Sequence, residues 1–280
     1  MSIKSGRRRM MGRLGLVFLL VTWAGSAWAT SQQKIVEAKG CPDCRLVLGS
    51  LRGLDVPDAN FRGANFREAD MKGVVLPRAD FRDVSMERTE MEKADVTDAN
   101  FTEASMRDID MEKSKVAGAN FSEADLRDAD LEEVDGTGAR FVDADMRGAT
   151  FRRAILAGAN FTDGHLERAD MERIIARGVV FRDARMDYVD LDRADLSGAD
   201  LSGAHLKSAR FSSTNLSGAR LVGANLDDAL LRRTNFSGAD LTDVKGLSQE
   251  DLSLACGDSK TVLPSGLKIR RCSADDQDDD

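Results

Sequence analysis

Apolar residues recur at every fifth position through most of this 280-residue chain. From Phe61 to Leu241 there are 37 such positions, and all hold Phe, Leu, Met or Val except Gly136 and Ala176. Two residues before each of them the chain has Ala in 25 of the 37 units, and the residue in between is Asp or Asn in 21. The repeated unit is therefore Ala, then Asp or Asn, then a large apolar residue, then two variable residues.

A period of five fits neither a continuous strand nor a helix. Side chains alternate along a strand, so an odd spacing would place successive apolar residues on opposite faces. In a helix, five residues would rotate the apolar position by about 140° each time. The pattern therefore predicts a chain that turns once per unit and forms a coil with its apolar residues toward the axis.

A second period, of 20 residues, indicates that four units close one coil. Phenylalanine recurs at this spacing in the first column of apolar positions: Phe61, Phe81, Phe101, Phe121, Phe141, Phe161 and Phe181. We expect these rings to form one buried stack. A neighbouring column of apolar positions holds smaller residues: Val96, Val116, Gly136 and Ala176. Small residues beside the large rings keep the side-chain volume of each coil balanced, as close packing requires.

These units resemble the pentapeptide-repeat family over about 195 of the 280 residues. The resemblance implies an all-β fold, a right-handed quadrilateral β-helix with short N- and C-terminal caps. We expect the β-helix at residues 51–244 and an N-terminal cap with a cysteine pair at 30–50. Residues 245–280 are expected to form a C-terminal capping helix, with Ser248 as its N-cap, and an acidic disordered tail.

The first 29 residues have the pattern of a secretory signal peptide. Basic residues precede an apolar run from Leu14 to Trp23, and Ala27-Trp28-Ala29 follows as a small-x-small site. The run is shorter than the roughly 20 residues that span a bilayer, so no transmembrane anchor is expected after cleavage at Ala29. The sequence predicts a periplasmic or secreted protein, and both Sec and twin-arginine export remain open.

Four cysteines form two pairs that are local in sequence: Cys41 with Cys44, and Cys256 with Cys272. An even count in an oxidising compartment predicts a disulfide in each pair. Cys-x-x-Cys is also a zinc-ligand spacing, but a zinc site would require the two pairs to meet from opposite ends of the chain. A thioredoxin-like redox role lacks the strand and helix that surround such a motif.

No catalytic or cofactor-binding motif is present, so we expect no enzyme activity, no cofactor and no small-molecule substrate. His165 and His205 share one face but are expected two coils apart, about 10 Å, with Arg185 between them. That separation predicts two surface histidines and no metal site.

Outward positions stack into charged ladders when the sequence is folded by 20. The acidic ladder is Asp83, Glu103, Glu123, Asp143, Asp163 and Asp183. The basic ladder on the opposite side is Lys93, Lys113, Arg153, Arg173 and Arg193, with Glu133 interrupting it. These ladders are either neutral, solvated faces or docking surfaces for charged partners. Since like charges repel at this spacing, we expect cations or arginines such as Arg82 and Arg182 to neutralise the acidic one.

A glycine column and exposed apolar residues indicate a candidate interaction surface. The column is Gly118, Gly138, Gly158, Gly178, Gly198, Gly218 and Gly238, at positions where a type II turn needs a positive φ. Ile155 and Ile175 lie nearby, where Asp or Asn is usual, together with Arg177 and Val180. We expect this side to bind an unknown protein partner or a second copy of the chain.

The function that this pattern predicts is a non-enzymatic scaffold that presents an extended surface for protein–protein interaction. The family resemblance offers an alternative, because several cytoplasmic members imitate DNA and bind gyrase. Removing residues 1–29 leaves 35 basic and 48 acidic side chains, so nucleic acid is not expected as a partner. The signal peptide and the basic ladder argue against DNA mimicry, which needs uniform negative charge.

Overall fold

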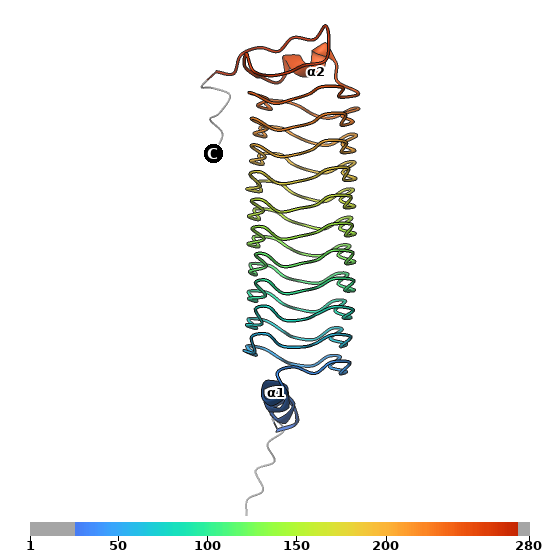
Figure 1. Ribbon diagram of the computed structural model, residues 1–280, viewed down its shortest axis with the longest axis vertical. Coiled ribbons are helices and arrows are strands. Elements are labelled where there is room, and N and C mark those ends of the chain that lie inside the picture. The colour runs from blue at the N-terminus through green and yellow to red at the C-terminus, as the bar shows by residue number, and fades with distance from the viewer. Residues whose placement is uncertain (1–25, 274–280) are drawn as a thin grey trace, which may run out of the picture.

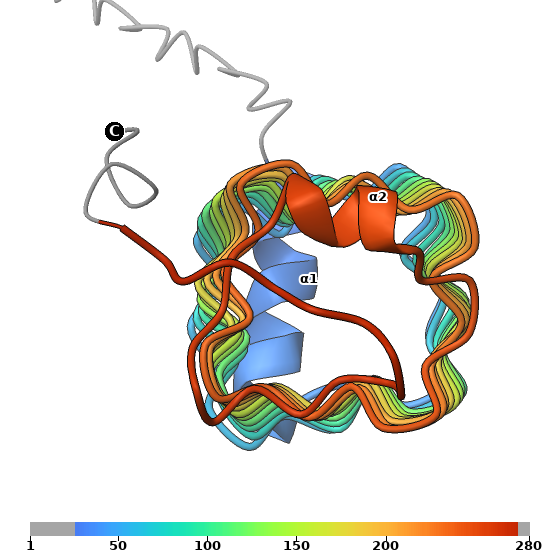
Figure 2. The ribbon, with the colours of Figure 1, turned by 90° about the horizontal axis from the view of Figure 1, so that it is seen from above.

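The chain winds into a long, straight rod, as shown by the computed structural model, which describes residues 26–273 and the side chains from Gln32 onward (Figure 1). Successive coils are joined by parallel bridges between residues 20 apart, such as Asn100 with Asn120. Seen along the axis, the coils superpose on a square (Figure 2). Each side is one five-residue unit, so the predicted four-sided coil is present.

Every corner is a tight turn. In one unit the Ala64 N–H donates to the carbonyl oxygen of Phe61 at 2.9 Å, and Gly63 between them has φ +67°. Each side contributes a single bridge residue, and the described residues contain no longer strand. The backbone is nevertheless paired from coil to coil, since Phe81 N–H donates to Asn100 O at 2.8 Å and Asn100 N–H donates to Ala79 O at 2.9 Å.

The core is a continuous column of side chains, and its predicted phenylalanine stack is confirmed. All seven rings from Phe61 to Phe181 are fully buried. The centroids of successive rings are 4.7 to 5.3 Å apart. Where the neighbouring column contains Gly136, a Cβ atom would come within 3.0 Å of the Leu156 side chain, so the missing side chain leaves no void.

The alanine position also faces inward, and hydroxyl side chains replace alanine there in some units. Thr89 and Thr234 are fully buried. Thr89 Oγ1 donates to Phe66 O at 2.9 Å, and Thr234 Oγ1 donates to Phe211 O at 2.8 Å. Because each hydroxyl reaches a carbonyl of the preceding coil, these polar groups enter the core without losing a hydrogen bond.

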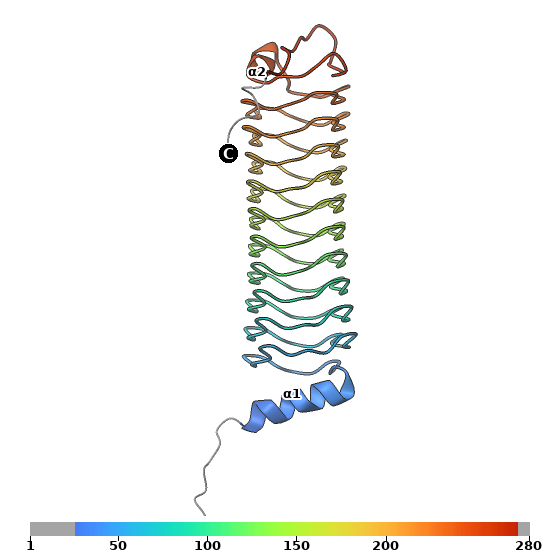
Figure 3. The ribbon, with the colours of Figure 1, turned by 90° about the vertical axis from the view of Figure 1, so that its left-hand side faces the viewer.

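Helix α1, Ser26–Ala38, covers the N-terminal end of the rod (Figure 3). Ile35 on this helix is buried, and Gln32 Nε2 donates to Ser50 O at 3.0 Å. The coil begins at Gly40, which bridges Asn60. Residues 40–50, which we expected in the cap, therefore already belong to the first coil. Residues 1–25 of the predicted signal peptide lie outside the described residues, and its last four residues begin α1.

Helix α2, Gln249–Ser253, covers one side of the C-terminal end (Figure 2). Ser248 is its N-cap, as the sequence predicts, and forms a capping box with Asp251. Leu252 on this helix is fully buried. After it, Cys256 bridges Asn235 and Val262 bridges Asp240, so the chain adds a partial coil over the end. The acidic run at residues 275–280 lies outside the described residues.

Both cysteine pairs lie at disulfide-bonding distance. Cys41 and Cys44 are the first and fourth residues of the first turn, with Cα atoms 5.5 Å apart. Cys44 N–H donates to Cys41 O at 3.4 Å, as the inward residues of other turns do. The Cα atoms of Cys256 and Cys272 are 4.8 Å apart, which also suits a disulfide. The first pair therefore occupies the inward positions that hold a large residue and alanine elsewhere.

Over residues 26–273, neither helix has the length and apolar character needed to cross a membrane.

Candidate interaction surface

When each unit is counted from its large apolar residue, both ladders and the glycine column occupy the same structural position, the third residue. That residue lies at a corner with φ in the left-handed region, whether it is Asp163 at +56°, Arg173 at +60° or Gly178 at +64°. The second residue of the unit shares the corner, and the fifth is the bridge residue in the middle of the next side. The charged ladders therefore run along edges of the square rod, and the bridge residues form the centre of each side.

The Asp or Asn at the bridge position accepts hydrogen bonds from the turn that follows it in most units. Asn100 Oδ1 accepts a hydrogen bond from the Thr102 N–H at 3.0 Å and another from Thr102 Oγ1 at 2.6 Å. Asn160 does the same for Thr162. Because a short side-chain acceptor stabilises the following turn, Asp and Asn are favoured here. A bridge residue that lacks this acceptor is therefore not explained by the turn.

Five of the six acidic-ladder residues form no ion pair within residues 26–273. The exception is Asp83, whose Oδ2 lies 3.1 Å from Nε of Arg62. Arg82 and Arg182, which we expected beside the ladder, instead form ion pairs at 2.6 Å with bridge residues Asp80 and Asp200. Arg62, Arg82 and Arg182 all occupy the second position of a unit, but only Arg62 reaches the ladder, so the other five acids are not neutralised by ion pairs within the described residues.

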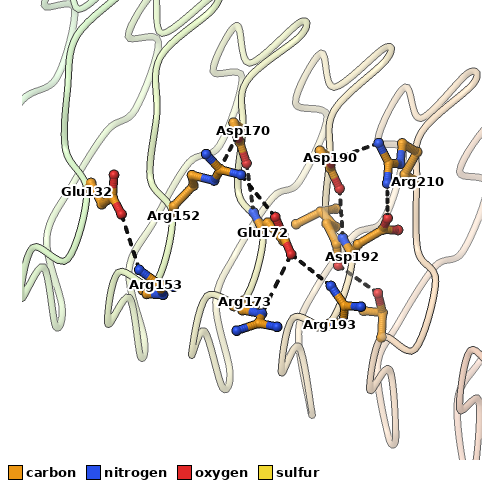
Figure 4. Close-up of polar contacts among 12 residues, drawn as sticks. Glu132, Arg152, Arg153, Asp170, Glu172, Arg173, Asp190, Asp192, Arg193 and Arg210 are labelled. Carbon is orange, nitrogen blue, oxygen red and sulfur yellow. Dashed lines mark hydrogen bonds and ion pairs between the residues drawn. The ribbon is translucent and has the colours of Figure 1, made fainter. Parts of the chain in front are cut away.

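The basic ladder is not a free basic edge, because an acidic column lies beside it (Figure 4). From residue 92 to residue 192 this column is the residue before each ladder position, and five of its six members are acidic: Glu92, Glu112, Glu132, Glu172 and Asp192. The sixth is Arg152. Lys113 lies 3.8 Å from Glu133, and Arg153 lies 3.5 Å from Glu132. Arg193 lies 3.0 Å from Glu172. The ladder therefore cannot present the unopposed positive field that its sequence predicts.

Glu172 is the centre of this ion-pair network. It accepts hydrogen bonds from Arg152 at 3.3 Å and Arg193 at 3.0 Å, and Arg173 lies 3.6 Å away. Burial raises the pKa of this carboxyl, but the hydrogen bonds from Arg152 and Arg193 outweigh it, so the pKa lies below its ordinary value. The acids directly before four of the five basic-ladder residues are visible in the sequence, but their pairing depends on the shape of the corner.

Ile155 and Ile175 come together on one side of the rod. They bridge each other in successive coils, and 42% and 45% of their surfaces are exposed. Arg177 lies at the next corner and is held by an ion pair to Asp195 at 2.6 Å. Val180 is separate, since it is the half-buried central residue of the neighbouring side and bridges Asn160. The structure thus unites three of the four residues expected at this surface.

The glycine row forms the corner between these two sides. Its members have positive φ, as the turn requires, but so do Asp and Arg at other corners. A Cβ atom on Gly138, Gly158, Gly178 or Gly198 would meet nothing within 4 Å. Crowding therefore does not force glycine at these four positions, and the row leaves a bare corner next to Ile155 and Ile175.

His165, Arg185 and His205 stack along another side, where they bridge in sequence. With Asp163 and Asp183 they line a shallow surface hollow of about 480 Å³. Over the described part of the chain, no group of three or more His, Cys, Asp or Glu side chains could hold a metal ion.

Two family models match this chain. The model for a pentapeptide repeat region matches residues 84–161. The model for pentapeptide repeats (8 copies) matches residues 50–83, 59–98, 154–191, 177–212 and 209–245. No curated protein matches the sequence.

Several solved structures are similar to this one. HetL, a pentapeptide repeat protein involved in heterocyst differentiation regulation in Nostoc sp. strain PCC 7120, is 24% identical; the alignment covers 78% of this chain and 92% of HetL, with a TM-score of 0.41. Full-length QnrB1, a plasmid-mediated fluoroquinolone resistance protein, is 18% identical over 79% of this chain and 94% of its own, with a TM-score of 0.34. A pentapeptide repeat protein of the Arabidopsis thaliana thylakoid lumen is 27% identical over 48% and 82%, with a TM-score of 0.21.

Proposed function

The chain belongs to the pentapeptide repeat family, and from this premise we propose that it is an exported, non-enzymatic scaffold that binds another protein through the side centred on Ile155 and Ile175. The family implies a right-handed winding of the four-sided coil. The interior of the coil is filled by buried side chains from Phe61 to Leu241, so binding groups can be offered only on the outside. Scaffolding by an outer surface fits this construction.

The observation that supports this site best is the exposure of two adjacent isoleucines. At the bridge position most units use Asp or Asn, whose side chain stabilises the turn. Ile155 and Ile175 give up that hydrogen bond and expose apolar surface, which has a cost unless the surface is covered. The bare glycine corner beside them gives a partner access without obstruction. Together these features favour a protein contact over a solvated face.

Export rests on the sequence pattern of residues 1–29 and is supported by the cysteines. Both pairs lie at bonding distance, which suits an oxidising compartment. Imitation of DNA is less well supported, because the acidic side chains around Glu172 are interleaved with Arg152, Arg173 and Arg193. A duplex presents uniform negative charge.

An affinity-capture experiment with a matched pair of variants tests the proposed site. The double variant Ile155→Asn and Ile175→Asn removes the apolar surface and supplies the usual turn acceptor. Leu230→Asn is the control, because Leu230 is also an exposed apolar bridge residue, at 56% exposure, on a different side. We expect the double variant to lose a protein that the wild type and Leu230→Asn retain from the exported fraction of the native host. Equal recovery by all three proteins would refute the site.

A further inference from the structure

A hollow of about 620 Å³ lies along the corner diagonally opposite the glycine row. The turns at this corner contain residues such as Arg147 and Gly148, whereas the glycine-row corner contains Arg177 and Gly178. The two corners are two sides of the square apart. The hollow is therefore separate from the side with Ile155 and Ile175, and the inference drawn from it does not depend on the proposed function.

The absence of a side chain at Gly148 deepens this hollow. Gly148 lies in a corner column between Asp128 and Arg168, where the neighbouring units carry long or charged side chains. Its φ of +72° is one that other residues adopt at this position, but a Cβ atom here would come within 2.7 Å of Asp128 Oδ1. The missing side chain leaves a gap in the column, bounded by Asp128 on one side and Arg168 on the other.

Arginines form one wall of the hollow. Arg107, Arg127 and Arg147 come from the same position of three successive coils, so they are spaced by one coil, about 4.8 Å. Arg147 uses Nε and Nη2 to bind both oxygens of Asp145, at 2.8 and 2.6 Å. Arg127 binds Asp125 in the same way.

These carboxylates fix the guanidinium groups without consuming all of their donors. A guanidinium has five N–H groups, so the Nη1 edges of Arg127 and Arg147 remain available to an anion. The side chain of Arg107 has no ion-pair or hydrogen-bond partner among residues 26–273. Prepositioned donors reduce the entropy lost on binding. The wall is therefore suited to a carboxylate or another oxyanion.

The opposite end of the hollow offers an aromatic ring. Tyr188 is the single tyrosine of the chain, and 55% of its surface is exposed. The guanidinium of Arg168 lies 5.9 Å from its ring centroid and orients the ring. An exposed ring with a polar tip can stack on a flat apolar face of a ligand.

Acceptors complete the lining and narrow the choice of ligand. Glu167 and Asp187 line the hollow together with the arginines. Glu167 Oε2 is shielded from solvent and accepts no hydrogen bond within the described residues. Such an orphan acceptor requires a donor. An anion without hydroxyl groups, such as sulfate, supplies no donor to these carboxylates, whereas a ligand that carries several hydroxyl groups beside its anionic group suits both the arginines and the acceptors.

We propose that this corner binds an acidic saccharide, a chain of sugar rings that bear carboxylates. The carboxylates pair with the arginine wall, the hydroxyl groups donate to Glu167 and Asp187, and the C–H face of one ring stacks on Tyr188. The coil spacing of the arginines allows successive units of such a chain to bind along the rod axis.

Isothermal titration of the mature protein with a galacturonic acid tetramer tests this proposal. The comparison ligands are a neutral galactose tetramer of the same linkage and inorganic phosphate. We expect the acidic tetramer to bind measurably tighter than both. Arg107→Gln and Tyr188→Ala should each weaken its binding about tenfold, since a charged hydrogen bond and a stacked ring have that worth. Both side chains are exposed, so the thermal unfolding of these variants should match the wild type.

Arg140→Gln is the matched control, because Arg140 is an exposed arginine on another side that forms no ion pair among residues 26–273. This variant should bind as the wild type does. Equal binding of the neutral tetramer would overturn the proposal, as would displacement of the acidic tetramer by an equal concentration of phosphate. Unchanged affinity in Arg107→Gln or Tyr188→Ala would overturn it too.

Discussion

The rings of Phe101 and Phe121, twenty residues apart in the chain, lie with their centroids 4.8 Å apart and their planes within 3° of parallel. The distance between successive rings equals the rise of one coil, so the stacked rings and the backbone bridges repeat at the same interval along the axis. The core and the backbone therefore support the same register. A change to one ring is felt by its neighbours above and below.

Truncation of a central ring should be among the most destabilising single changes. Phe121→Ala removes a fully buried ring from between two stacked neighbours, and the rigid coil cannot close the cavity. We expect a loss of about 3–5 kcal/mol in the free energy of unfolding. Phe121→Leu should cost less, because Leu201 and Leu221 occupy the same column. Urea unfolding followed by circular dichroism measures both, and equal losses would contradict this reason.

The network around Glu172 should make stability depend on pH. The folded-state pKa of Glu172 lies below its ordinary value of 4.5, so its contribution is present above that value and disappears as the pH falls through the folded pKa. Glu172→Gln should therefore destabilise the protein at pH 7, by roughly 0.5–1 kcal/mol because the site is partly solvated. At pH 3 the difference from the wild type should shrink.

Glu123→Gln is the control for that comparison. Glu123 belongs to the acidic ladder and has no ion pair in the described part of the protein, so its loss should not destabilise the protein at either pH. Melting temperatures of the wild type and both variants at pH 7 and pH 3 measure these differences. A difference for Glu172→Gln that stays constant between the two pH values would show that its charge is not what stabilises the network.

Two glycines with positive φ should respond very differently to alanine. At Gly158 a Cβ atom meets open space, so the cost comes only from the left-handed backbone and is about 1–2 kcal/mol. At Gly40 the φ is +124° and a Cβ atom would lie 2.1 Å from Asn60 O. Gly40→Ala should therefore displace the start of the coil and cost more than Gly158→Ala. Similar melting temperatures for both variants would contradict the assigned N-terminal boundary.

The cysteine pairing remains a prediction that peptide mapping can test. Non-reducing digestion of the exported protein should yield one linked peptide for Cys41 with Cys44 and another for Cys256 with Cys272. Reduction of the second bond should lower stability by about 2–4 kcal/mol, because it frees the loop of residues that closes the C-terminal end. Recovery of free thiols at all four positions would refute both bonds.

Much of the fold could be predicted because its signal is periodic. The spacing of Phe61 and Phe81 gives the number of sides directly, since inward residues of successive coils must superpose. The start of the coil was missed because Cys41 and Cys44 occupy inward positions and conceal the repeat. Helix α1 was missed because it follows no repeat and is stabilised by contacts at the end of the rod, such as burial of Ile35.

The surface was less predictable than the core. Folding the sequence by 20 identifies which residues stack, but not which corner side chains reach each other. For example, Arg182 pairs with Asp200 and not with the acidic ladder, which the stacking pattern alone did not reveal. The hollow beside Arg107 and Tyr188 was not foreseen either, because it needs residues from two adjacent columns and a missing side chain at Gly148.

Site-specific photo-crosslinking in the native host tests the proposed protein contact most directly. A photoreactive residue at Arg177, exposed beside Ile175, should capture a partner and give a product of higher mass on a denaturing gel. The same residue at Arg185, exposed on the opposite side, should not. The account predicts a defined product at position 177 that disappears when Ile155 and Ile175 are both changed to Asn. Absence of a product at position 177, or equal products at positions 177 and 185, would contradict it.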